Sequence, residues 1–157
     1  MSKLMDLVAG DAREILMVIG LDDLAALDDP RRFTAHLALG GGLDPTWLDL
    51  FSEAVRTVTG ADEPPDFIDA RLELDGPGGD DDLMIERVDP SWIGTVARIA
   101  EHDLAAIAGH WIALVEDELG ELPREEKPWI RELAGQVVAV CRAADRAPDV
   151  LFAWSLR

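Results

Sequence analysis

Apolar residues follow two different periods along this chain. From Phe33 to Leu39 they alternate with polar residues, which predicts a strand buried on one face. Gly40, Gly41 and Gly42 end that strand. Asp44 and Pro45 then supply an N-cap acid and a proline at the first helical position. Apolar residues recur at helical spacing from there to about position 58, so a helix is predicted.

The same order of elements returns in the middle of the chain. Residues 67–74 resemble the first strand in their pattern, and Asp89 and Pro90 repeat the helix opening. The second copy has about ten more residues between its strand and its helix than the first copy has. These residues hold an acidic loop and a further strand at 83–88. We interpret this as an internal strand-helix duplication. The alternative is chance recurrence, because Asp-Pro opens many helices.

Three further segments complete the predicted order of elements. Residues 14–19 are apolar and branched, which favours a strand followed by a short helix from Asp22; a helix that begins at Asp11 is the alternative. A long helix is predicted from Pro90 to about Gly120, and another from Pro128 to Ala144. Residues 150–156 predict a final strand.

This order predicts one α+β domain that spans residues 1–157. We expect a mixed or mainly antiparallel sheet of about five strands, with the helices packed on one face. The length is typical of one domain, and 48% apolar residues suffice for a core.

Net charge narrows the choice of partners. The chain has 32 acids and 14 bases, a net charge of −18, which repels nucleic acid and anionic lipid. Such a charge favours either a basic protein as partner or simple solubility. No segment reaches the roughly 20 apolar residues of a membrane span, and the N-terminus lacks the pattern of a secretory signal. With a single cysteine, Cys141, no internal disulfide can form, so we predict a cytoplasmic protein.

Half of the acidic excess lies between Gly60 and Asp89, where 11 acids face 2 bases. The loop at 75–86 runs from an Asp to a Glu over twelve positions, but Pro77 and Gly79 occupy ligand positions of a calcium loop. No metal is therefore predicted at this loop. A solvated loop is one interpretation of its acids and an acidic docking surface is the other; the residues of that surface are Asp75, Asp80, Asp81, Asp82 and Glu86.

A second and weaker site prediction is a polar pocket. Its candidate residues border apolar faces, and they are His36, Arg71, His102 and His110. The last two histidines are eight residues apart, too far to share a metal without a third ligand between them. The glycines at 40–42 lack the Gly-Lys-Ser/Thr of a P-loop, so no cofactor is predicted.

No catalytic motif accompanies these residues, and we assign no catalytic residue. Cys141 lies in the apolar stripe of the last helix, which predicts a core position. The resulting hypothesis is a protein-binding module of the immunity or antitoxin-like kind, or an inhibitor of a basic protein. The alternatives are a small-ligand-binding protein or hydrolase with a His/acid pocket, and a structural protein that forms homodimers.

Overall fold

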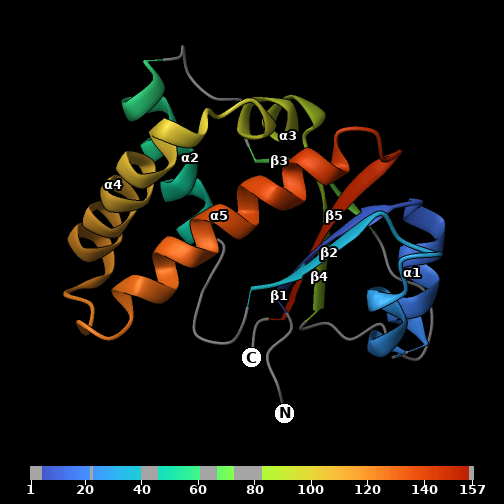
Figure 1. The fold of residues 1–157 in the computed structure, drawn as a ribbon. Coiled ribbons are helices and arrows are strands. Elements are labelled where there is room, and N and C mark those ends of the chain that lie inside the picture. The colour runs from blue at the N-terminus through green and yellow to red at the C-terminus, as the bar shows by residue number, and fades with distance from the viewer. Residues whose placement is uncertain (1–4, 22, 40–45, 61–66, 73–82, 156–157) are drawn as a thin grey trace.

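The computed structural model describes residues 5–21, 23–39, 46–60, 67–72 and 83–155 (Figure 1). Side chains at 69–72 and 155 are outside this description. In chain order the elements are β1 (Met5–Gly10), α1 (Ala12–Gly20), the 3-10 helix η1 (Leu24–Asp28), β2 (Ala35–Ala38), α2 (Thr46–Thr59), β3 (Ile68–Leu72), β4 (Leu83–Val88), α3 (Pro90–Ala97), α4 (Glu101–Leu119), α5 (Lys127–Ala144) and β5 (Asp149–Ser155).

The five described strands form one sheet in the order β2-β1-β5-β4-β3, and every neighbouring pair is antiparallel. The predicted α+β class with a mainly antiparallel sheet is therefore confirmed. The central strand, β5, pairs with β1, so the first and last described strands are neighbours, with Leu7 of β1 opposite Phe152 of β5. Sequence patterning missed β1 because all six of its residues are buried. A strand covered on both faces shows no apolar-polar alternation.

Helices cover both faces of the sheet, whereas the sequence predicted one covered face. Figure 1 shows α2, α3, α4 and α5 on one side and α1 on the other. The larger core lies under the four helices and includes Leu7, Trp111 and Phe152. A smaller core lies under α1 and η1 and includes Val8 and Ile15. Alternate residues of β1 enter different cores, as the pleat of a strand requires.

Residues 12–19 form a helix, so the favoured strand prediction was wrong and the alternative from Asp11 was right. The Asp11 carboxylate accepts hydrogen bonds from the backbone N–H groups of Arg13, at 2.9 Å, and Glu14, at 3.2 Å. Ile15, Val18 and Ile19 are buried at helical spacing. N-capping and packing on the sheet together outweigh the strand preference of branched residues.

The single long helix predicted from Pro90 is in fact two helices. Asp89 caps α3 by accepting from Ser91 N–H at 2.8 Å, but the helix ends at Ala97 and α4 begins at Glu101. Arg142 of α5 occupies the break. Its guanidinium donates to the carbonyl oxygens of Ile99, at 2.6 Å, and Ala97, at 3.2 Å. This stop comes from a distant side chain, so local sequence could not reveal it.

Cys141 lies in the core, as the sequence predicted, and so do Trp47, Trp92 and Trp111. Trp92 and Trp111 are each no more than 1% exposed. The indole N–H of Trp92 donates to Ser52 Oγ at 2.6 Å, and that of Trp111 donates to the carbonyl of Trp47 at 2.8 Å. The proposed duplication stays a prediction: its two strands, β2 and β3, are the opposite edges of the sheet.

Candidate functional site

Of the five residues of the predicted acidic docking surface, the structure describes one, Glu86. Asp75, Asp80, Asp81 and Asp82 lie outside the described residues. Glu86 lies in β4 and accepts a hydrogen bond from the indole N–H of Trp154 at 2.8 Å. Strands β3 and β4, which lie within residues 60–89, form an antiparallel pair at one edge of the sheet.

The four residues of the predicted polar pocket lie on three different elements. His36 is in β2 and Arg71 is in β3, so they occupy opposite edges of the sheet. His102 and His110 are on α4, which packs against α2 and α5. The structure does not bring the four together. His102 is almost fully exposed, and its ring lies 3.6 Å from the carboxylate of Asp103.

His36 instead belongs to a cluster with two acids that sequence reasoning missed. On the α1 side of the sheet, His36 lies opposite Val8, and Asp6 of β1 faces the same way. His36 Nδ1 is 2.6 Å from Asp28 Oδ1, and Nε2 is 3.5 Å from Asp6 Oδ1. Asp6 is buried, whereas the side chain of Asp28 is 76% exposed. Asp6 in an otherwise apolar strand was the available signal.

The two carboxylates decide the protonation of His36. Interaction with Asp6 is the main cause that raises the pKa of His36 above 6.5; Asp28 adds to it, and burial opposes it. Both ring nitrogens face a carboxylate, so the protonated ring is the form that suits this site. A general base needs a free nitrogen lone pair aimed at substrate. The contacts of His36 with Asp6 and Asp28 join β2 to β1 and to η1.

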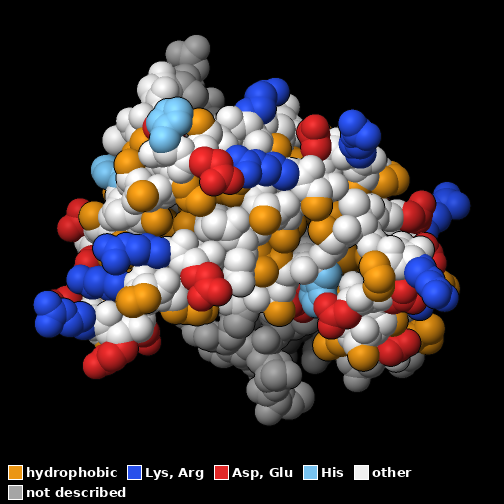
Figure 2. Space-filling view, viewed as in Figure 1, with side chains coloured by type: hydrophobic (Ala, Val, Ile, Leu, Met, Phe, Trp, Pro, Cys, Tyr) orange, Lys and Arg blue, Asp and Glu red, His pale blue; other side chains and the backbone are white. Residues whose placement is uncertain are grey.

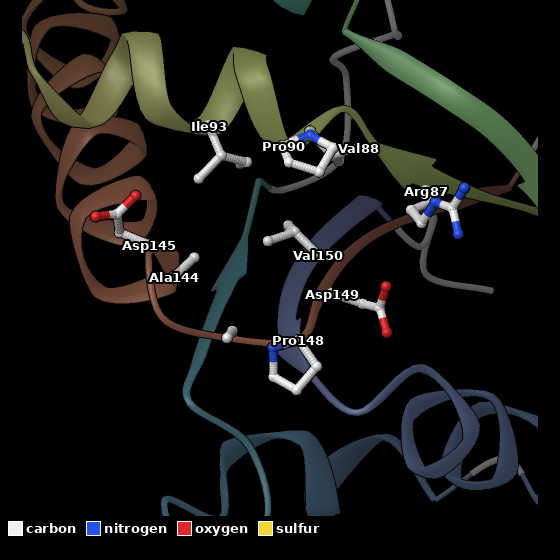
Figure 3. A pocket seen from close by; sticks show the side chains of 10 residues that line it. Arg87, Val88, Pro90, Ile93, Ala144, Asp145, Pro148, Asp149 and Val150 are labelled. Atoms are coloured by element: carbon white, nitrogen blue, oxygen red, sulfur yellow. The ribbon is translucent and has the colours of Figure 1, made fainter.

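A shallow hollow lies where α5 ends and α3 begins (Figure 3). Its floor is apolar, with Val88, Ile93 and Val150, and the carboxylates of Asp145 and Asp149 point away from one another at its border. The volume is about 70 Å³. Pockets that enclose a drug-sized ligand run from about 300 Å³ upward. The hollow can hold a few waters or part of one side chain.

Burial removes Cys141 from the candidates for chemistry. The side chain is fully buried in α5, and desolvation raises the pKa of its thiol to about 12. A thiol that stays protonated is a poor nucleophile and a poor metal ligand. Within the described part of the chain, no three His, Cys, Asp or Glu side chains are placed to share a metal ion.

The connection between α4 and α5 forms a further surface, which sequence analysis did not single out. Residues 116–132 hold seven acids and three bases, and two large apolar side chains are exposed there: Leu119 at 49% and Trp129 at 40%. Figure 1 shows this connection at the end of the helical layer farthest from the sheet. On the face shown in Figure 2, hydrophobic side chains lie between scattered acidic and basic side chains.

These features define an α+β protein with an antiparallel sheet and a net charge of −18. No known protein family, curated protein or solved structure matches the chain. Among the helices of the described residues, none is both long and apolar enough to cross a membrane.

Proposed function

We propose that this chain is a non-catalytic protein-binding module that docks on a basic protein, in the manner of an immunity protein, an antitoxin-like protein or an inhibitor. The observation that supports it is the charge: −18 over 157 residues, with half of the excess in residues 60–89. The described part of that segment is the edge pair β3 and β4. The proposal places the partner at this edge of the sheet.

Electrostatics sets the chemistry of the proposed partner. A surface of this charge accelerates encounter with a cationic protein and suppresses contact with phosphate-bearing molecules. The partner is therefore a basic protein and not a nucleic acid or a membrane, and the proposed compartment is the cytoplasm. Because exposed charges are screened over about 10 Å at 0.1 M salt, the association rate should fall as salt rises.

The test is capture followed by reconstitution. The protein is immobilised and exposed to lysate of its own source at low and moderate salt. A captured candidate is then purified, and its binding is measured with the wild-type chain. A variant with Asp75, Asp80, Asp81 and Asp82 replaced by Asn should bind more weakly. A control with Asp23, Glu53, Asp103 and Asp145 replaced by Asn or Gln has the same net charge, lies outside both residues 60–89 and residues 116–132, and should lose less.

Two results would overturn this proposal. One is that no basic protein reconstitutes a saturable complex with the purified chain. The other is that the reconstituted complex is insensitive to salt. Light scattering on the same samples detects the competing homodimer, since a chain that pairs with itself elutes at twice the monomer mass without any partner.

A further inference from the structure

Trp129 differs from the other tryptophans of the chain in its surroundings. Trp47, Trp92 and Trp111 are buried, and Trp154 is partly buried with its N–H bound to Glu86. Trp129 is 40% exposed, and its indole makes no hydrogen bond to the part of the chain that the structure describes. Exposed tryptophan is uncommon on free protein surfaces and enriched at the centres of protein interfaces.

The backbone under Trp129 is firmly held. The next residue, Ile130, is fully buried, and its N–H donates to the carbonyl of Glu126 at 3.1 Å. Glu116 of α4 fixes the preceding connection: it accepts from Leu122 N–H at 3.2 Å and lies 3.5 Å from Lys127 Nζ. A side chain presented from such a support loses little conformational freedom on binding.

Acids and bases lie on different sides of α5 around this residue. Glu126 and Glu132 are three positions before and after Trp129, which places them within about 60° of it around the helix axis. Glu126 has helical dihedral angles, so the helical path includes it. Lys127 and Arg131 are two positions away, about 160° around the axis. Trp129 therefore shares its face with two exposed carboxylates and with neither of these bases.

The chemistry of this face fits a guanidinium group. A planar cation stacks on the face of an indole, and its N–H groups donate to carboxylates beside the ring. An ammonium group makes the same ion pair, but it lacks the planar stack and the forked hydrogen bonds. The face thus distinguishes arginine from lysine, which net charge alone cannot do.

We propose that Trp129, with Glu126 and Glu132, is a docking site for an arginine side chain of a protein partner. This inference rests on the proposed function, because it takes the partner to be basic. It adds a specific contact at the α4–α5 connection, which is separate from the acidic segment at residues 60–89.

The test titrates a capped pentapeptide that contains two arginines into the 15N-labelled full chain. The control is the same peptide with both arginines replaced by lysine. The five indole N–H signals are followed by NMR, and the Trp129 signal is identified by its loss in Trp129→Phe. The arginine peptide should shift the Trp129 signal saturably, with an affinity at least about threefold above that of the lysine peptide.

Matched variants separate this site from general charge. Glu126→Gln with Glu132→Gln should weaken binding at least about threefold, and Trp129→Ala should weaken it further. Glu53→Gln with Asp145→Asn removes the same charge far from Trp129 and should change the affinity less. Trp129→Phe keeps an aromatic ring and should retain part of the affinity for the arginine peptide. Unchanged melting temperatures confirm that each variant is folded.

The outcomes distinguish this inference from the proposed function. If the Trp129 signal does not move while others do, or if both double variants lose affinity equally, the proposal of an arginine site at Trp129 is refuted. The proposal that the chain docks on a basic protein is then unaffected. If the peptide moves the Trp129 signal but no basic protein forms a complex, the proposed function fails and the site remains as a guanidinium-binding surface.

Discussion

Replacement of Ser52 by alanine tests how much the buried hydrogen bond between Trp92 of α3 and Ser52 of α2 stabilises the fold. Ser52 is buried, and its Oγ accepts from Trp92 N–H at 2.6 Å while it donates to the Leu48 carbonyl at 3.0 Å. Ser52→Ala deletes the acceptor and leaves the indole N–H of a 1% exposed tryptophan without a partner. The Leu48 carbonyl loses less, because it can still accept the helical backbone bond.

The expected cost follows from these contacts. A buried donor left without an acceptor costs about 1–3 kcal/mol, and the better helix propensity of alanine returns about 0.5 kcal/mol. We expect the free energy of unfolding to fall by about 1–2 kcal/mol. For a chain of this length, each kcal/mol corresponds to about 2–4 °C in Tm.

The assay is urea unfolding of a double-mutant cycle. Trp92→Phe removes the donor, so Ser52→Ala should cost about 1 kcal/mol less in that background than in the wild type. Thr57→Ala is the control, because its hydroxyl also donates to a carbonyl one turn back, at 2.9 Å from Glu53, but is exposed. It should change stability by under about 0.5 kcal/mol. Additive effects of Ser52→Ala and Trp92→Phe would refute the reasoning.

Three other predictions concern the remaining buried or bridging side chains. The raised pKa of His36 means that its contacts with Asp6 and Asp28 stabilise the fold fully below about pH 6.5 and are lost as pH rises through the folded-state value. The stability difference between wild type and His36→Gln, measured by urea unfolding, should therefore shrink from about pH 6 to about pH 8; a constant difference contradicts it. Arg142→Lys should lower the free energy of unfolding by about 1 kcal/mol, since one ammonium cannot reach the carbonyls of both Ala97 and Ile99. It should also speed amide hydrogen exchange at the start of α4; unchanged exchange would show that Arg142 does not hold the break between α3 and α4. Cys141 should react with a thiol reagent at the rate of global unfolding, because it is buried with a pKa of about 12; rapid labelling of native protein would show that α5 opens locally.

Sequence patterning succeeded where one local cause determines an element. Asp89 and Pro90 open α3 as predicted, and the alternating positions around His36 mark β2. It failed where the cause is distant. The break between α3 and α4 depends on Arg142, which is more than 40 positions away, and β1 is hidden by burial on both faces.

The sites show the same division between local and distant causes. Sequence identified His36 as a polar residue on an apolar strand, but its partners come from β1 and from η1, which only the fold brings beside β2. The exposure of Trp129 was equally hidden, because Pro128 before it resembles the openings that bury Trp47 and Trp92. Which tryptophan faces solvent depends on how α5 is rotated against α4.

The position of β5 has a consequence for folding in the cell. Met5 pairs with Trp154, so the middle of the sheet consists of strands separated by nearly the whole chain. Neither sheet core can close before residues 149–155 leave the ribosome, and α1 has no complete surface to cover until then. Such distant pairing slows folding and leaves apolar strands exposed during synthesis. Until β5 is inserted, we expect the nascent chain to need chaperones, or its high negative charge, to keep it from aggregating.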